Sequence, residues 1–290
     1  MKKMILMAMA ALVCGCEKSV FDENDVAEIE TAHDVPTKQF TFIVKGDFGS
    51  ATFTRGYLQA DGHAMTDLWV FDYMDGVCVQ QSHRTATDEG WGKPTLALAY
   101  GSHHVYFVAS RGDGATVDKD GHTIVWTGPR DTFWKDYSVD VVSSSNGNRA
   151  VTLDRVATKL RLAVNDEVPE GCKSVSVTPE RWYYGWDYVN GIATAAQQSV
   201  RIVDVPESLI GTIGQLAVNI YGLSSNDEWV TNIDVKAEDA GGSVIGSARI
   251  VGAPFKANRS TDYNGNLFGS NGGLDVNINT AWDTTIQGIW

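Results

Sequence analysis

Apolar and polar residues alternate along many short stretches of this chain, and that period of two limits the fold more than any other feature. In FTFIV, Phe40, Phe42 and Val44 share one parity, while Thr41 and Ile43 share the other. Successive side chains of a β-strand point to opposite faces of a sheet, so the alternation predicts strands with one buried face. The same pattern recurs in DLWVFDY (67–73), HHVYFVAS (103–110), KLRLAV (159–164), QLAVNIY (215–221) and WVTNIDV (229–235).

Turn sequences separate these stretches. Pairs of Asp-Gly and Asn-Gly, which suit tight hairpin turns, lie between them, and only residues 208–213 favour a helical turn. Many short strands with regular turns predict an all-β sandwich or barrel, not a parallel sheet with crossover helices. The pairs are Asp75-Gly76, Asp120-Gly121, Asn146-Gly147, Asn190-Gly191 and Asn264-Gly265.

The length of the chain suits two domains. It has 290 residues, of which 43% are hydrophobic, enough for about two ordinary domains with real cores. SSSNGN (143–148) is the best linker, because strand-like runs lie on both sides of it. We therefore expect tandem β-sandwich domains over residues 37–147 and 148–290, preceded by a flexible acidic tether over residues 16–36.

The start of the chain resembles the export signal of bacterial lipoproteins. Lys2 and Lys3 precede a short apolar run, and Val13-Cys14-Gly15-Cys16 resembles a lipobox. The resemblance implies a signal peptide over residues 1–15 and acylation of Cys16, which would tether the protein to the outer membrane. Cys14 is the weaker acceptor because bulky Val13 precedes it, and an ordinary cleaved signal is the alternative.

Charge limits both the partners and the location. The formal net charge is −13, and lysine and arginine do not cluster, which argues against nucleic acid as a partner. Asp22, Glu23 and Asp25 follow Cys16 closely. They resemble the acidic tract that directs lipoproteins of Bacteroidetes to the cell surface, although a solvated tether has the same composition.

No pattern in the sequence indicates catalysis. The chain lacks GxSxG, HExxH and a phosphate-binding glycine loop, and no carboxylate pair stands out. Cys78 and Cys172 lie far apart without CxxC spacing, which indicates no metal site. We expect them in different domains as two buried, inert thiols, although the compartment would permit a disulfide. The expectation is a protein without enzyme activity and without a cofactor.

One aromatic segment leaves two interpretations open. RWYYGWDY (181–188) places Trp182, Tyr184 and Trp186 on one parity. Exposed rings at this spacing would form a platform for glycans, whereas buried rings would fill a core or a subunit interface. The core or interface interpretation is favoured, and solvent exposure of the rings decides between the two.

Four passages in order are similar to the fimbrillin superfamily, the subunits of type V pili in Bacteroidetes. They are the lipobox, ATFTRGYL followed by MTDLWVFDY, VTLDRVATKLRLAV, and APFKANRSTDYNGNLFG before the final strands. The resemblance covers most of the chain after the signal. It implies two transthyretin-like β-sandwich domains, lipoprotein export, and polymerisation with other pilus subunits in a fimbrium at the cell surface, where the subunits serve adhesion.

Processing of the N-terminus also follows from this resemblance. In such subunits an arginine-directed protease removes an N-terminal strand and opens a groove. Arg55 is the first arginine of the chain, so we hypothesise that it is the maturation site, and a surface position on a strand is the alternative. Anchor subunits keep their lipid, and the sequence does not distinguish an anchor, a shaft subunit or a tip.

The C-terminal segment is the expected donated strand. It is persistently apolar at one parity and ends on a tryptophan, whereas chain ends are normally frayed and polar. Such a segment needs a groove, either a neighbour's or its own, and for an isolated subunit its own sheet is slightly favoured. Its apolar residues are Leu274, Val276, Ile278, Trp282, Ile286 and Trp290.

A surface lipoprotein that binds glycans for a polysaccharide-uptake system is the alternative. It would share the acyl anchor, the acidic tether and the sandwich domains. It differs in needing Trp182 and Trp186 exposed on one face.

Overall fold

The computed structural model describes residues 35–46, 59–60, 63–120, 122–198, 200–268 and 273–279. Within these ranges every regular element is a β-strand, except one 3₁₀ turn, η1 (Glu207–Leu209), which lies where the sequence favoured a helical turn. The prediction of an all-β fold is confirmed. Several predicted features lie outside the described residues: the signal peptide, residues 16–34 of the tether, Cys16, Arg55, Trp282, Ile286 and Trp290.

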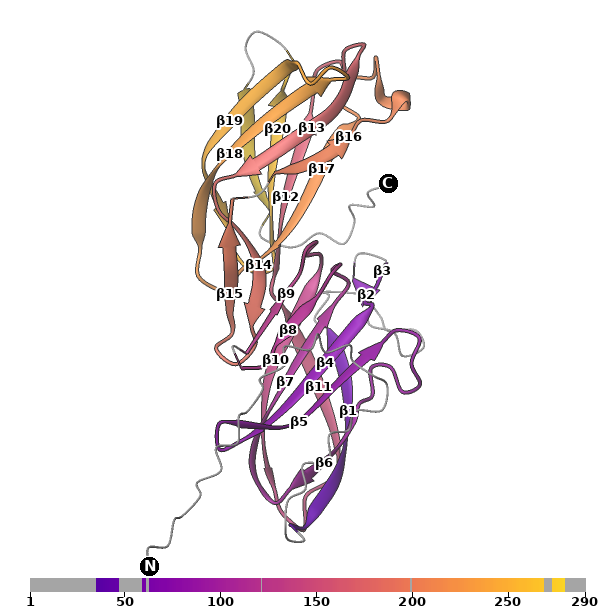
Figure 1. Ribbon diagram of the computed structural model, residues 1–290, viewed down its shortest axis with the longest axis vertical. Helices are drawn as coiled ribbons and strands as arrows, with labels where there is room; N and C mark the ends of the chain where they lie inside the picture. Colours follow the sequence, from indigo (N-terminus) through magenta and orange to yellow (C-terminus); the bar gives the residue numbers. More distant parts are fainter. Residues whose placement is uncertain are drawn as a thin grey trace, which may run out of the picture.

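Strands from the first half of the chain form a seven-stranded sheet that folds over on itself (Figure 1). Two neighbouring strands near its middle, β10 (Thr132–Val141) and β11 (Asn148–Arg155), pair only through Phe133 with Arg155 and Trp134 with Asp154. Because the sheet bends at this short contact, its two parts face each other as a sandwich. In order across the sheet, the strands are β5 (Val77–Thr85), β4 (Asp67–Met74), β7 (Gly101–Ser110), β10 (Thr132–Val141), β11 (Asn148–Arg155), β1 (Thr37–Gly46) and β6 (Thr95–Ala99).

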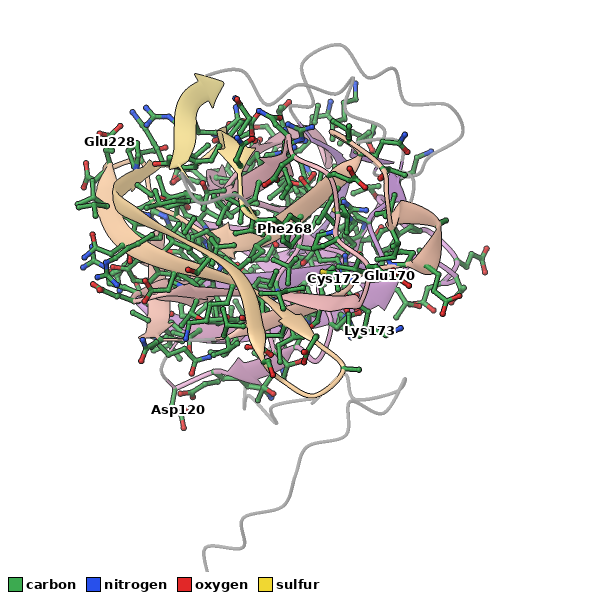
Figure 2. The ribbon with its side chains drawn as sticks, turned by 90° about the horizontal axis from the view of Figure 1, so that it is seen from above. Asp120, Glu170, Cys172, Lys173, Glu228 and Phe268 are labelled. Carbon is green, nitrogen blue, oxygen red and sulfur yellow. The ribbon has the colours of Figure 1, made fainter. Side chains whose placement is uncertain are left out.

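Strands from the second half form a sandwich of two four-stranded sheets, whose inner faces bury one core that includes Leu160, Val175 and Ile233. Figure 2 looks down onto this lobe and shows Phe268 on its inner side and Glu228 at its outer edge. One sheet has the order β17 (Leu216–Leu223), β12 (Ala157–Val164), β20 (Arg259–Asn266) and β21 (Gly273–Asn279). The other has the order β16 (Arg201–Asp204), β13 (Cys172–Pro179), β18 (Trp229–Asp239) and β19 (Val244–Phe255).

A third four-stranded sheet joins the two lobes at the waist of the molecule (Figure 1). Its strands are β15 (Ile192–Gln197), β14 (Trp182–Asp187), β9 (Thr123–Val125) and β8 (Thr116–Asp118). The last two come from the first half of the chain, and β14 comes from the second. Backbone pairing of β9 with β14 therefore links the lobes directly.

The joining sheet covers the outer face of β4 and β7. Trp69 and Phe71 of β4 pack there against Trp126, Trp186 and Tyr188, and the Phe71 and Tyr188 rings stack with centroids 4.1 Å apart. Six consecutive residues of β4 are buried in consequence. Alternation predicted one buried face for this strand, and the structure buries both.

The expected boundary between the halves is wrong. Residues 142–147 form the turn between β10 and β11, and β11 stays in the first lobe, where it pairs in parallel with β1. The chain passes to the second lobe at Val156, between β11 and β12. Ser, Asn and Gly suit a tight turn as well as a linker, which explains the error.

Two shorter features complete the first lobe. The predicted Asp75-Gly76 turn joins β4 to β5, and both residues have positive φ (51° and 78°), as a two-residue type I′ hairpin requires. β2 (Gln59–Ala60) and β3 (His63–Ala64) pair with each other in a small separate ladder.

Candidate functional site

β1 occupies an internal position in its sheet. It pairs in parallel with β11 on one side and antiparallel with β6 on the other. The segment just before β6 continues this pairing. There, the amides of Phe42 and Val44 donate to the carbonyls of Pro94 and Gly92, both at 2.9 Å. Both edges of this first strand are therefore hydrogen-bonded, and its removal would leave two unpaired edges.

The side chains of β1 fill the first-lobe core at alternate positions. Phe40 and Phe42 are fully buried and Val44 is 4% exposed, whereas Ile43 between them is 39% exposed. The Phe42 ring contacts Phe107 of the opposite layer edge-on, with centroids 5.2 Å apart. The seat of β1 is thus a groove with regularly spaced apolar pockets.

A buried polar pair fixes one wall of this seat. Nδ1 of His103 lies 2.7 Å from Oδ1 of Asp72, and Nε2–H of His103 donates to the carbonyl of Ala99 at 2.9 Å. Burial raises the pKa of Asp72, and the hydrogen bond from His103 opposes that rise. Ala99 ends β6 and pairs with Thr37 of β1, so the pair holds the corner beside the start of β1.

β21 lies at the edge of a sheet in the second lobe. It pairs antiparallel with β20 and has no strand on its other side within the described ranges. The backbones of Leu274, Val276 and Ile278 lie in this strand, opposite Gly265, Tyr263 and Thr261. The predicted C-terminal segment thus begins as a strand paired with one neighbour.

Asp166 anchors the chain just before β21. Its carboxylate accepts hydrogen bonds from the amides of Leu267 (3.1 Å) and Phe268 (2.7 Å). Sequence reasoning missed this residue, and no local signal could have found it, because its partners lie 101 and 102 positions further along the chain.

The aromatic segment does not form a glycan platform, which corrects that interpretation. Trp182, Tyr184 and Trp186 are 0%, 2% and 1% exposed. The Trp182 indole donates to the carbonyl of Tyr221 at 2.9 Å within the second-lobe core, and Trp186 packs in the core between the lobes. The favoured interpretation, that these rings fill a core, is the one that their burial supports.

Two further kinds of site, for metal ions and for membrane insertion, were sought in the part of the chain that the structure describes. There, no group of three or more His, Cys, Asp or Glu side chains could hold a metal ion. The described residues also contain no helix with the length and hydrophobicity to cross a bilayer.

Comparison with known proteins rests on structure alone, since no family model and no curated sequence matches the chain. The fimbrial anchor protein Mfa2 of Porphyromonas gingivalis superposes with a TM-score of 0.54 at 10% identity, over 84% of this chain and 98% of that one. A fimbrial assembly protein of Parabacteroides distasonis gives 0.51 at 11% identity, over 84% and 99%. The chain shares its fold with fimbrial proteins of Bacteroidetes.

A third solved structure belongs to the same fold. A protein of Bacteroides ovatus, provisionally described as an adhesin, gives a TM-score of 0.52 at 12% identity, over 84% of this chain and 94% of that one. The similarity of this chain to all three extends over nearly their whole length. The sandwich architecture expected from the fimbrillin resemblance is therefore confirmed.

Proposed function

We propose that the chain is a non-catalytic structural subunit of a cell-surface fimbrium, assembled with other pilus subunits by strand addition and serving adhesion. The fold shared with fimbrial anchor and assembly proteins supports this proposal. The observation that carries it is the position of β1. It is the first strand of the described residues, yet it is internal to its sheet, and its side chains fill a core.

Loss of β1 would create an acceptor groove. The edges of β11 and β6 would lose their hydrogen-bond partners, and the pockets of Phe40, Phe42 and Val44 would empty. Unpaired backbone groups with apolar pockets at alternate positions are what an added strand recognises.

Arg55 is placed in the chain where cleavage would have this effect. It follows β1, which ends at Gly46, and precedes β4, which begins at Asp67. A cut after Arg55 would separate β1, the tether and an acylated Cys16 from the remaining strands. A subunit that escapes cleavage would stay attached to the outer membrane through Cys16.

The C-terminal segment is the proposed donor. Within the described residues, β21 pairs with one neighbour in its own sheet, whereas the emptied groove offers two. Leu274, Val276 and Ile278 have the parity needed for alternate pockets, and Trp282, Ile286 and Trp290 continue it. Transfer of this segment into the groove of a second molecule would replace backbone pairing with one strand by pairing with two. It would also bury the apolar side chains of the segment, which favours assembly.

The test treats the purified chain with an arginine-specific protease. Intact mass spectrometry then locates the cut, and size-exclusion chromatography follows assembly. We expect cleavage after Arg55 and the appearance of oligomers, because cleavage empties the groove.

Two variants serve as controls. Arg55→Ala should remain uncut at this position and monomeric, and a chain lacking residues 273–290 should be cut but should not assemble. Fibre subunits that all retain an acylated Cys16 would contradict the cleavage. A cleaved chain that stays monomeric would contradict strand addition.

A role in polysaccharide uptake is not retained as a second function. It depended on an exposed platform formed by Trp182, Tyr184 and Trp186, and all three rings are buried.

A further inference from the structure

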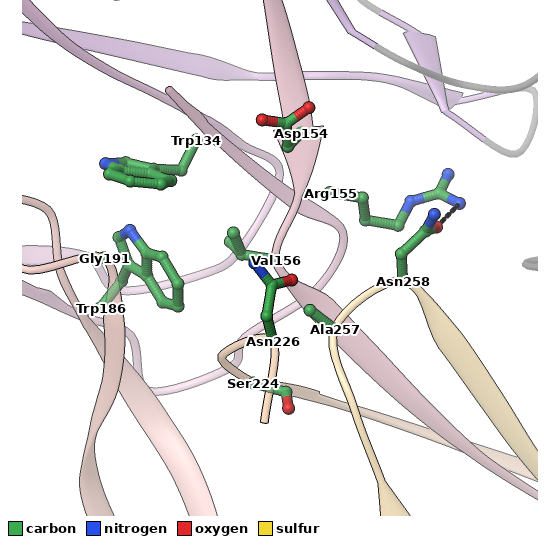
Figure 3. Close-up of a pocket in the computed structure, with 10 residues that line it drawn as sticks. All are labelled: Trp134, Asp154, Arg155, Val156, Trp186, Gly191, Ser224, Asn226, Ala257 and Asn258. Atoms are coloured by element: carbon green, nitrogen blue, oxygen red, sulfur yellow. Dashed lines mark hydrogen bonds between the residues drawn. The ribbon is translucent and has the colours of Figure 1, made fainter. Parts of the chain in front are cut away.

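A pocket of about 240 Å³ lies where the two lobes meet (Figure 3). Trp134 of β10 and Asp154 of β11 line it from the first lobe. Trp186 of β14 and the loop residues Asn226 and Asn258 line it from the second part of the chain. Assembly by strand addition makes no use of this pocket, so its lining needs a separate explanation.

One wall is a fixed aromatic surface. The half-buried Trp134 ring lies against Trp186, with centroids 5.6 Å apart and an angle of 63° between the planes. The Trp134 indole donates to the carbonyl of Tyr188 at 2.9 Å. A Cβ at Gly191 would come within 2.8 Å of the Trp134 ring, so only glycine permits this close packing. The indole is thereby held in place beside the pocket.

Hydrogen-bonding groups without protein partners surround this wall. The Trp186 indole N–H is buried and has no acceptor among the described residues. Oδ1 of Asn258 accepts from Arg155 at 3.3 Å. The side-chain amide nitrogen of Asn258 and the side-chain amide of Asn226 have no hydrogen bond in the described part of the chain, and the Asn226 side chain points into the pocket in Figure 3. The two exposed asparagine side chains therefore leave amide groups available to an occupant of the pocket.

The charges around the pocket cancel locally. The Asp154 carboxylate pairs with Lys135 at 2.9 Å. The Arg155 guanidinium pairs with the buried Asp131, also at 2.9 Å. An ionic ligand would have to compete with these partners, so the pocket suits a neutral one.

We propose that this pocket binds one ring of a neutral saccharide. A sugar ring offers an apolar face of C–H groups for an indole and hydroxyl groups that both donate and accept hydrogen bonds. Trp134 supplies the stacking surface. The side-chain amides of Asn226 and Asn258 supply directional contacts, as is usual in small-molecule sites. The volume limits the occupant to about one ring.

The test measures sugar binding by the intact, uncleaved chain, so it does not depend on assembly. Methyl glycosides of glucose, galactose, mannose and N-acetylglucosamine are titrated separately. The indole N–H signals of the nine tryptophans are followed by NMR. At least one glycoside should shift the Trp134 and Trp186 signals in a saturable way and leave most of the others in place.

Four variants locate the site. Trp134→Ala and Asn226→Ala should each weaken binding by about tenfold, since each removes one main contact. Tyr100→Ala, an exposed ring elsewhere, and Asp227→Ala, the neighbour of Asn226, should leave binding unchanged. Asn226 is exposed, so its variant should fold even if Trp134→Ala does not.

Two results would overturn the proposal. One is the absence of saturable shifts with all four glycosides. The other is a binding strength that Asn226→Ala leaves unchanged, which would place the sugar elsewhere. Neither result bears on strand addition, which has its own assay.

Discussion

Cys172 shows how strongly the second-lobe core excludes water. Its side chain is 1% exposed at the start of β13, and burial raises the pKa of its thiol. Cys78 lies in the other lobe, on β5, and is half-buried. Both thiols are free, and the expected burial is found for Cys172 but only in part for Cys78.

The raised pKa of Cys172 predicts a pH-dependent stability. The folded protein keeps the thiol proton above about pH 8.5, where an unfolded chain begins to lose it. The folded state then binds more protons, so this contribution is complete below about pH 8.5 and declines as the pH rises through the folded pKa. The stability difference between the wild type and Cys172→Ala, measured by urea unfolding, should therefore shrink between neutral and alkaline pH.

Val175→Ala is the matched control for this measurement. Val175 lies in the same core and the same strand but does not titrate, so its stability difference should not change with pH. A Cys172→Ala difference that stays constant up to alkaline pH would contradict the raised pKa.

For single residues, the sequence indicated which side chains lie on the same face of a strand, but not which other elements pack against that face. Trp182, Tyr184 and Trp186 share one parity, yet the first two enter the second-lobe core and the third enters the core between the lobes. Aromatic side chains suit a core and a ligand surface equally well. Only the elements packed against them decide, and those come from distant parts of the chain.

At the scale of elements, β1 should contribute to stability mainly through its inward side chains. Phe42→Ala removes a fully buried ring that contacts Phe107 and Tyr137, and we expect it to lower the free energy of unfolding by about 3–5 kcal/mol. Chemical denaturation of the uncleaved chain measures this loss.

Ile43→Ala provides the comparison within the same strand. Ile43 points away from the core and is 39% exposed, so its loss should be about 1 kcal/mol or less. Equal losses for the two variants would show that β1 is not seated through its alternate side chains, and would weaken the groove on which the proposed function rests.

Most strands could be predicted from the sequence, because the period of two and the Asp-Gly and Asn-Gly turns are local signals. Strand pairing could not. The alternation in β11 says nothing of its parallel partner β1, more than a hundred residues earlier, and so the boundary was placed one strand too early. Likewise, the six buried residues of β4 depend on a covering sheet that the segment itself does not reveal.

At the scale of the whole molecule, the lobes form one continuous structure. The β9–β14 pairing carries a sheet across the junction, and beneath it lies an aromatic core with residues from both halves of the chain. These contacts join segments about sixty residues apart, so no sequence window contains them. A connection of this kind would suit the role of fibre subunit proposed above.

A buried ion pair strengthens the junction where the chain crosses it. Two nitrogens of Arg155, at the end of β11, meet the Asp131 carboxylate at 2.9 and 3.1 Å, and the side chains are 2% and 0% exposed. A third nitrogen of Arg155 reaches Asn258 of the second lobe. Removing one charge from such a pair leaves the other buried without compensation.

Asp131→Asn should therefore destabilise the protein by about 3–5 kcal/mol, although the asparagine side chain has nearly the same shape as the aspartate side chain. Asp234→Asn breaks an exposed ion pair with Arg249 and should cost about 1 kcal/mol or less. Calorimetry measures both losses and also tests the junction. The wild type should unfold in a single transition, because neither lobe can unfold without exposing the core that they share. Two separated transitions in the wild type would mean that the lobes unfold independently. Equal losses for the two variants would mean that the ion pair of Arg155 with Asp131 does not secure the contact between the lobes.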